Sequence, residues 1–365
     1  MVRRCSPQAL DFGLGTKRMN KRSWMRWLHS SSDNRQSKIQ NLKWAEFLAI
    51  LVLLVGCAGI AEAQQSAKTY RVGVIQPGGP FTAVVEGLRD GLTELGYEDG
   101  KQIRLEIRET RGDLSAAKEA AKAFQQDKMN LLYTVATSVV VAAKESTSNI
   151  PIIFAVAGDP IRSGLIQSFA KPGGRLTGVY YLTGDLTPKR LEILKEILPK
   201  LRKVVTFYNP NNPSSAEAAK LGREAARQMK IQFIERHVNS IDELRQILQN
   251  IKIGEVDAYF LVSDAMITSQ AQTIVQMALA KKLPTMVQEQ SLVAAGGLAS
   301  YGQNFHEVGR MSAKYVQKVL TGSHPQDLRV ETADKFEMAV NLKTAKQIGV
   351  TIPPEVLARA DKVIR

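Results

Sequence analysis

The sequence predicts an α/β protein of two lobes, each a three-layer αβα arrangement with a parallel sheet between helices. Three observations support this prediction. Short runs rich in β-branched residues alternate with amphipathic stretches, the runs are mostly apolar rather than strictly alternating, and the series restarts partway along the chain. Strands that are apolar on both faces are typical of a parallel sheet covered by helices. We therefore expect right-handed crossovers within each lobe.

The first series begins after Thr69 and predicts lobe 1 over residues 69–178. Gly96 is placed to end its first helix, and Asp113 is placed to cap its second. The expected strands are 70–75, 103–107, 131–135 and 152–156, and the expected helices are 82–95, 114–126 and 138–146.

The second series predicts lobe 2 over residues 179–290, joined to lobe 1 near residues 176–183. Thr187-Pro188 opens a helix because proline is favoured in a first helical turn, and Asn212 is placed to cap the next helix. The expected strands are 204–208, 231–236, 258–262 and 285–287, and the expected helices are 187–198, 213–229, 241–249 and 265–281.

The last part of the chain is expected to pass between the lobes. Residues 291–325 are predicted to return to lobe 1, through a strand at 298–301 and a helix at 305–320. Residues 326–365 are predicted to form a C-terminal segment that crosses between the lobes, with a strand at 335–340. The two lobes are therefore expected to be joined by several hinge segments.

Residues 1–63 are interpreted as a basic N-terminal extension followed by a signal peptide. The fifteen uncharged residues 47–61 have the length of a signal-peptide core and fall short of the about 20 apolar residues of a membrane span. Two processing sites compete, since Cys57 ends a possible lipobox and Ala63 ends a small-x-small cleavage site. An uncleaved membrane anchor is a further alternative. We expect an extracytoplasmic protein, secreted or lipid-anchored at Cys57.

Composition excludes several kinds of chemistry. The two cysteines, Cys5 and Cys57, both precede residue 64, so a thiol nucleophile and a cysteine zinc site are excluded. The net charge of +14 is spread over helical faces that also carry acids, as in Lys189-Arg190-Leu191-Glu192, so we expect no nucleic-acid partner. The histidines lack metal-ligand spacing and no Gly-x-Ser-x-Gly elbow occurs, so we expect no metal, no cofactor and no enzyme activity.

Candidate ligand-binding residues follow from one rule of α/β topology. Ligands of open α/β sheets bind beyond the carboxyl ends of the strands, where loops lead into helices. The residues at these places, or near the expected crossings, are Gln76, Phe81, Thr137, Ser138, Asp159, Tyr208, Asn209, Ser263, Asp264, Gln288 and Tyr301.

Each of these candidates also has a purely structural interpretation. Thr137 and Ser138 open a helix whose free amides suit a carboxylate, but they equally suit a plain helix cap. Asp159 and Asp264 suit an ammonium-bearing ligand held between the lobes, although Asp159 also fits a turn and Asp264 also fits a helix cap. Asn209 fits an ordinary turn.

The two candidate aromatic residues also leave an alternative open. Phe81 and Tyr301 suit contact with a ligand ring or with aliphatic ligand surface. Core packing is the alternative for each of them.

Several motifs in fixed order resemble one family. They are Phe154-Ala155-Val156-Ala157-Gly158-Asp159-Pro160-Ile161, Lys171-Pro172-Gly173-Gly174-Arg175-Leu176-Thr177-Gly178, Tyr208-Asn209-Pro210, Ala295-Gly296-Gly297-Leu298-Ala299-Ser300-Tyr301-Gly302, and the closing stretch 336–346. This pattern resembles the ABC transporter substrate-binding proteins, a family that includes tryptophan-binding lipoproteins. The resemblance implies a type I periplasmic-binding-protein fold, hinge closure on a small amino-acid-like or aromatic solute, and an ABC permease as membrane partner.

Two other functions share the same lobes. A sensory receptor would present the bound solute to a membrane signalling partner, and genes for a kinase or chemoreceptor beside this one would favour it. A cytoplasmic repressor would need a helix-turn-helix module before Thr69, where the apolar run lies instead. We expect a monomeric, nonenzymatic solute-binding protein.

Overall fold

The structure, a computed structural model, describes residues 69–365. Residues 67–365 form one compact unit, which contains both sheets and all three hydrophobic clusters described below. We therefore treat this segment as able to fold on its own. The expected basic extension, the signal peptide and the lipidation candidate Cys57 lie outside the described residues.

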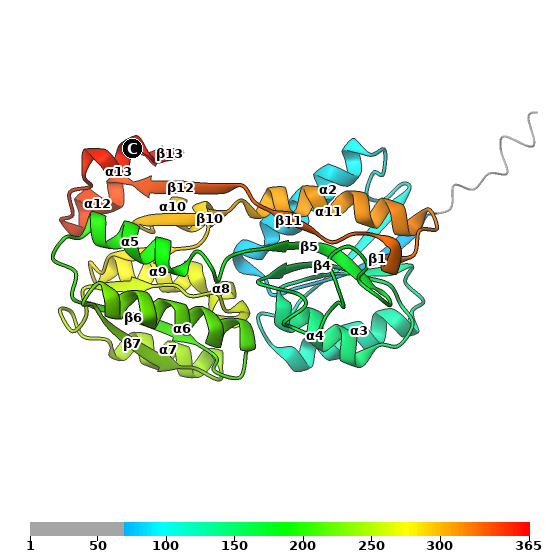
Figure 1. The fold of residues 1–365 in the computed structure, drawn as a ribbon, viewed down its shortest axis with the longest axis horizontal. Helices are drawn as coiled ribbons and strands as arrows, with labels where there is room; N and C mark the ends of the chain where they lie inside the picture. Colours follow the sequence, from blue (N-terminus) through cyan, green and yellow to red (C-terminus); the bar gives the residue numbers. More distant parts are fainter. Residues whose placement is uncertain (1–68) are drawn as a thin grey trace, which may run out of the picture. The chain divides into compact units, whose positions relative to one another are not determined.

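Lobe 1 is built on a sheet of six parallel strands (Figure 1). Their order is β11 (Glu331–Ala333), β5 (Leu176–Tyr181), β4 (Ile152–Ala157), β3 (Leu131–Val135), β1 (Tyr70–Gln76) and β2 (Ile103–Glu109). Helices α3 (Leu114–Gln126) and α4 (Thr137–Ser146) pack together, as do α2 (Thr82–Glu94) and α11 (Phe305–Leu320).

Helices α2 and α11 lie unusually close together because glycines face the contact. A Cβ added to Gly87 would lie 1.8 Å from the His306 carbonyl oxygen, and one added to Gly309 would lie 1.8 Å from that of Val84. No side chain fits at such distances, so the two helix backbones touch directly. This contact anchors α11 to lobe 1 although its sequence follows lobe 2.

Lobe 2 is built on a sheet of seven strands. Their order is β13 (Lys362–Ile364), β12 (Phe336–Asn341), β10 (Ala299–Gln303), β9 (Thr285–Val287), β8 (Ala258–Phe260), β6 (Lys203–Tyr208) and β7 (Gln232–His237). The β10–β12 pair is antiparallel, and the other pairs are parallel.

Helices cover both faces of the second sheet. The cluster on one face draws on α5 (Thr187–Ile197), α6 (Pro213–Gln228), α12 (Leu342–Ile348) and α13 (Pro354–Ala358). The cluster on the other face draws on α7 (Ile241–Asn250), α8 (Ala265–Ser269), α9 (Ala271–Ala280) and α10 (Gln290–Ala294).

Helix boundaries follow local chemistry where the sequence supplies a cap. The Asp113 carboxylate accepts hydrogen bonds from the Ser115 and Ala116 amides, and the Asn212 side chain accepts one from the Ser214 amide. Both caps confirm the predictions. The predicted helix 265–281 is instead two helices, α8 and α9, that are interrupted at Gln270.

The prediction that a strand at 298–301 returns to lobe 1 is wrong. Strand β10 lies in the sheet of lobe 2, where Tyr301 pairs with Met338 on β12 and Ser300 pairs with Val287 on β9. Only the following helix, α11, joins lobe 1. The antiparallel pairing with β12 explains the error, because it lies between segments more than thirty residues apart and leaves no local signal.

The chain crosses between the two sheets three times. The first crossing joins β5 to α5 over residues 182–186, the second joins β10 to α11 at Asn304, and the third joins β11 to β12 over residues 334–335 (Figure 1). The Thr183 hydroxyl donates to Gln303 Oε1 at 3.2 Å, and Asn304 Nδ2 donates to Glu337 Oε1 at 3.1 Å. Adjacent crossings are therefore linked by hydrogen bonds.

Candidate functional site

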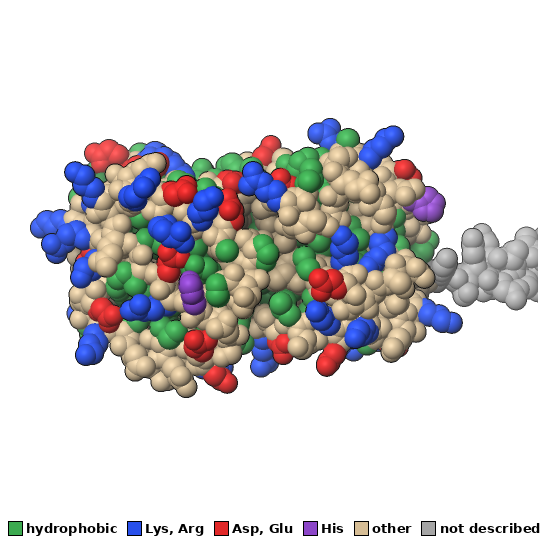
Figure 2. Space-filling model, turned by 60° about the horizontal axis from the view of Figure 1, so that its bottom comes forward, with side chains coloured by type: hydrophobic (Ala, Val, Ile, Leu, Met, Phe, Trp, Pro, Cys, Tyr) green, Lys and Arg blue, Asp and Glu red, His purple; other side chains and the backbone are tan. Residues whose placement is uncertain are grey.

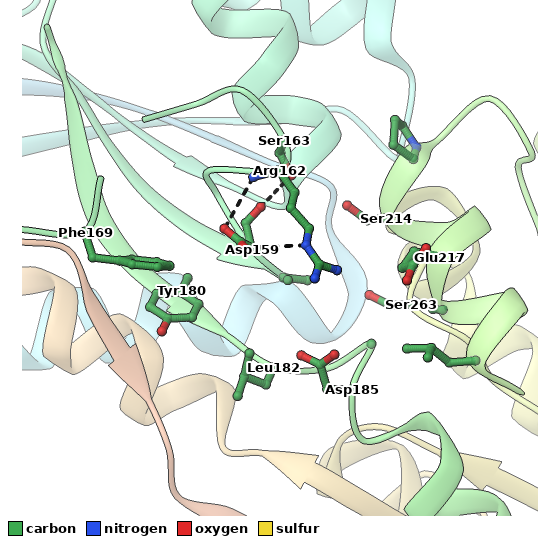
Figure 3. Close-up of a pocket in the computed structure, with 16 residues that line it drawn as sticks. Asp159, Arg162, Ser163, Phe169, Tyr180, Leu182, Asp185, Ser214, Glu217 and Ser263 are labelled. Atoms are coloured by element: carbon green, nitrogen blue, oxygen red, sulfur yellow. Dashed lines mark hydrogen bonds and ion pairs between the residues drawn. The ribbon is translucent and has the colours of Figure 1, made fainter. Parts of the chain in front are cut away.

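A cavity of about 380 Å³ lies where the strand ends of the two lobes meet. We call it the outer chamber (Figure 3). Lobe 1 contributes the loop after β4 and part of β5, the first crossing contributes one wall, and α6 with Ser263 closes the lobe 2 side. Its charged and aromatic lining residues are Asp159, Arg162, Phe169, Tyr180, Asp185 and Glu217. A cavity of this size suits a small organic solute.

A narrower space, the inner chamber, adjoins the outer one through Ala157, Ser214 and Ser263, which line both. Its volume is about 20 Å³, enough for one small polar group. Its polar lining residues are Thr137, Ser138, Asn212, Ser214, Ser263, Asp264 and Gln288, and its aromatic lining residues are Phe81, Tyr181 and Phe305.

The N-terminus of α4 opens into the inner chamber. Ala136 precedes this ten-residue helix with φ +75° and offers no side-chain cap. The Thr137 hydroxyl donates instead to the Ala157 carbonyl oxygen at 2.8 Å, which ties the helix start to the end of β4. The amides of the first turn therefore remain available to an anion, as at other uncapped helix N-termini.

Gln288 adds a second donor to the inner chamber. Its side chain is 3% exposed, it lines the same space as Thr137 and Ser138, and its Nε2 has no hydrogen-bond partner among the described residues. A buried amide donor without a partner costs free energy, so such groups normally face a ligand, a water or an ion. Gln288 and α4 together form a pair of donors suited to a carboxylate.

Asp264 is fully engaged by protein groups. Its Oδ1 accepts from the Ile267 amide at 3.0 Å, which caps α8, and its Oδ2 accepts from the Ser215 hydroxyl at 2.7 Å and the Asn209 amide at 3.1 Å. The helix-cap interpretation of Asp264 is confirmed. This carboxylate lines the inner chamber, and its bonds tie the loop after β6 to α6 and α8.

Asp159 combines a turn with a place in the cavity. Its Oδ1 accepts from the Ile161 amide at 2.7 Å, as the turn interpretation predicts. Its Oδ2 lies 3.8 Å from Arg162 Nε, and both side chains line the outer chamber (Figure 3). Asp159 Oδ2 is thus paired with a cation inside the outer chamber, and the Arg162 guanidinium lies among side chains of both lobes.

Aromatic rings form two walls of the site. Phe169 stacks on Tyr180 with ring centroids 5.0 Å apart beside the outer chamber (Figure 3). Phe81 stacks on Phe305 at 5.4 Å beside the inner chamber. The core-packing interpretation of Phe81 is therefore confirmed, although its ring also faces the cavity.

Four candidate residues lie outside both chambers. Gln76 Oε1 accepts from the Gly78 amide, and Asn209 Oδ1 accepts from the Asn211 amide, so both shape their own turns. Tyr301 packs against Phe336, with ring centroids 6.1 Å apart. These residues do not line the cavity.

Tyr208 is the fourth candidate outside the chambers. Its hydroxyl donates to Glu235 Oε2 at 2.6 Å and lies 3.0 Å from His237 Nε2. Burial and the hydrogen bond to the Glu235 carboxylate raise the pKa of Tyr208 to about 12. Its side chain is therefore committed to a network with β7.

Sequence reasoning missed most of the outer chamber. Phe169 lies in the loop between β4 and β5, and Glu217 lies on the second turn of α6, so neither directly follows a strand. Leu182, Gly184 and Asp185 belong to the first crossing. The expected hinge near residues 176–183 was the available signal, because hinge residues border the cleft that they close.

Residues 69–365 contain no helix that is long and apolar enough to cross a membrane. They also contain no group of three or more His, Cys, Asp or Glu side chains arranged to hold a metal ion. On the face shown in Figure 2, lysines and arginines are scattered with acidic side chains between them.

Two α/β lobes, three crossings and a cavity at the facing strand ends define a type I periplasmic-binding-protein fold, which solved solute-binding proteins share. Residues 71–364 match the family described as ABC transporter substrate binding protein. The chain belongs to this family.

This chain is similar to three proteins that have a stated ligand or a solved structure. A tyrosine-binding protein of Clostridioides difficile (strain R20291) is 28% identical over 266 residues, which are 73% of this chain and 76% of that protein. An ABC domain from Streptococcus pneumonia in complex with L-Trp is 27% identical, with a TM-score of 0.73 over 81% of this chain and 100% of that one. A ligand-free, open substrate binding protein from Clostridium difficile is 25% identical, with a TM-score of 0.55 over 81% and 99%.

Proposed function

We propose that this protein is the extracytoplasmic receptor of an ABC importer and binds an amino acid with a ring-bearing side chain. The cavity between the lobes and the relatives that bind tyrosine or tryptophan support this proposal. The protein would release its solute unaltered to a membrane permease, so no catalytic step is required. Export would follow from the signal peptide expected within residues 1–63, with or without a lipid at Cys57.

The carboxylate end of the amino acid is assigned to the inner chamber. The first-turn amides of α4, the Ser138 hydroxyl and the unpartnered Gln288 Nε2 are all donors, and they converge on one narrow space. Donors fixed by a helix and by a buried side chain lose little entropy on binding. The pair of Gln288 and α4 is the single observation that carries the proposal.

The rest of the ligand is assigned to the outer chamber. Asp159 offers a carboxylate oxygen to the ammonium group, and the Phe169–Tyr180 pair offers a flat apolar wall to the ring. Asp185 and Glu217 add acidic side chains, so a ligand side chain that ends in a hydrogen-bond donor suits this chamber better than one that ends in an anion.

Hinge closure is the expected response to the ligand. The two solved structures have similar sequence identity to this chain, but the TM-score is 0.73 for the one in complex with L-Trp and 0.55 for the ligand-free, open one. This difference supports lobes that approach one another around a solute.

A thermal-shift screen of residues 67–365 tests the proposal. A ligand that binds only the folded state raises the melting temperature by mass action. We expect L-tyrosine or L-tryptophan to raise it by about 2 °C or more at millimolar concentration. Glutamate, which is also an amino acid but ends in an anion, is the matched control and should give a smaller shift. Equal shifts for all three would contradict the proposal.

A further inference from the structure

Arg190 is a charged side chain that is wholly enclosed in lobe 2. Residues 187, 190, 191 and 194 form one stripe along α5, and this stripe faces the core. The exposed fraction of Arg190 is 0%, so this arginine does not contribute to the charged helical face that the segment Lys189-Arg190-Leu191-Glu192 predicts. Its position on the buried face of α5, and not its charge, determines that it is enclosed. Burial lowers the pKa of Arg190 to about 9, so the guanidinium remains charged at neutral pH.

A contribution to the stability of lobe 2 does not explain why an arginine is buried at position 190. Among residues 69–365 no carboxylate forms an ion pair with its guanidinium, and Nε and Nη1 have no hydrogen-bond partner. Burying a charge without a counter-charge is strongly unfavourable, whereas leucine would fill the same stripe at no such cost. An explanation has to come from the bonds that the guanidinium does make.

These bonds lead to two of the three crossings. Arg190 Nη2 donates to the Thr183 carbonyl oxygen at 3.0 Å and to the Thr187 hydroxyl at 3.1 Å. Thr183 lies in the first crossing, is 1% exposed, and donates through its own hydroxyl to Gln303 Oε1 at 3.2 Å. Gln303 is the last residue of β10, directly before the second crossing. A buried chain of hydrogen bonds thus joins α5 to both crossings.

The first crossing also forms a wall of the outer chamber. Leu182, Gly184 and Asp185 line it, and they flank the residue whose carbonyl group Arg190 holds. A change at Arg190 therefore reaches the cavity without any direct contact. Since two N–H donors of a planar guanidinium fix both acceptors in one geometry, lysine does not replace this arrangement fully.

We propose that Arg190 is the positioning residue of the hinge: through Thr183 and Gln303 it holds the first two crossings in the geometry that forms the outer chamber. The inference rests on the proposed function only in taking hinge closure as the response to a ligand. The distance between the lobes, and how widely it varies, can be measured in the ligand-free protein.

The test is a distance distribution between spin labels on the two lobes. Residues 67–365 contain no cysteine, so Glu119→Cys on α3 and Glu224→Cys on α6, both exposed, give a clean label pair. The distribution is recorded by pulsed electron resonance in the parent and in the Arg190→Met variant. Lys189→Met, on the exposed face of the same helix, is the matched control.

We expect the Arg190→Met variant to broaden the distribution in the ligand-free protein and to weaken amino-acid binding about tenfold, as loss of a charged hydrogen bond allows. The Lys189→Met variant should change neither. An unchanged width in a folded Arg190→Met variant would overturn the inference, even if its melting temperature falls, because a merely structural role predicts lower stability alone.

Two further variants keep the test decisive if Arg190→Met does not fold. Thr183→Val and Gln303→Leu each cut the bond between the crossings and keep the arginine. Broadening by either supports the inference, and an unchanged width in both contradicts it. If the parent binds no amino acid, the proposed function fails, while the label distances still decide the role of Arg190.

Discussion

The carboxylate of Asp264 accepts a hydrogen bond from the Ser215 hydroxyl at 2.7 Å, so the side chain that the sequence offers as a ligand contact is bonded within lobe 2. The same oxygen also accepts the Asn209 amide, and the other oxygen caps α8. The two candidate carboxylates, Asp159 on lobe 1 and Asp264 on lobe 2, therefore differ in what they can offer to a ligand. Asp159 Oδ2 faces the outer chamber with Arg162 Nε at 3.8 Å, whereas both oxygens of Asp264 accept hydrogen bonds from groups of lobe 2.

Asp264→Asn should reduce stability more than it reduces affinity. The Ser215 hydroxyl and the Asn209 amide now donate to one carboxylate oxygen, and the asparagine Nδ2 would face these two donors. Loss of their hydrogen bonds should lower the free energy of unfolding by about 2 kcal/mol. Chemical denaturation with calorimetric titration measures both quantities. Ser215→Ala removes one of these bonds and keeps the carboxylate. Its free energy of unfolding should therefore lie between those of Asp264→Asn and the parent.

Asp159→Asn should show the reverse pattern. Its turn oxygen is retained by asparagine, but the negative charge that faces the ligand ammonium is lost, so affinity should fall about tenfold with little change in stability. Titration with L-tryptophan and with its deaminated analogue, indolepropionate, provides the check. A loss of affinity for the analogue as large as that for the amino acid would contradict an ammonium contact.

Gln288→Leu should weaken binding without weakening the fold. The leucine keeps the volume and removes an amide whose Nε2 has no partner among the described residues, so stability should hold or rise. Loss of a hydrogen bond to a carboxylate should weaken affinity by about tenfold to a hundredfold. Gln288→Glu, which places a negative charge in the same space, should abolish carboxylate binding. A Gln288→Leu variant with parental affinity would contradict the inner-chamber assignment.

Phe169→Ala should change selectivity between ligands. Removing one ring of the Phe169–Tyr180 stack removes apolar wall beside the outer chamber, so affinity for L-tyrosine or L-tryptophan should fall about tenfold. Affinity for L-alanine, which does not reach that wall, should not change. Competition titrations measure the ratio. A parallel loss for all three amino acids would indicate a general disturbance of the site.

Glu289 makes stability depend on pH in a defined direction. Burial raises the pKa of Glu289, and the Glu337 carboxylate adds to the rise. The folded state therefore holds the proton more tightly than the unfolded state, and stability is lost as pH rises from the ordinary value of 4.5 through the folded value. Glu289→Gln should thus gain stability over the parent as pH rises, and lose that advantage near pH 4. Melting temperatures across this range test it, and a constant difference would contradict it.

The fold was largely predictable because its signals are local. Apolar runs, caps such as Asp113 and Asn212, and the twofold series predict strands and helices through residue 287. The sequence predicts β10 in the wrong lobe because its antiparallel partner, β12, is distant in sequence.

The site was predictable only where it directly follows strands. Thr137, Ser138, Ser263 and Gln288 line the inner chamber because parallel strands bring their carboxyl ends to one edge. The outer chamber depends on loops and on the face that α6 presents, which no local pattern specifies. Arg190 shows the limit most clearly, since its burial follows from helical period but its partners come from the crossings.

Calorimetric titration with two matched ligands tests the central claim most directly. L-tryptophan and tryptamine share the ring and the ammonium group and differ only in the carboxylate that the inner chamber is proposed to hold. We predict that residues 67–365 bind the amino acid at least tenfold more tightly than the amine, and that Gln288→Leu narrows this gap. Equal affinity for the two ligands, or a gap that Gln288→Leu leaves unchanged, would contradict the proposed site.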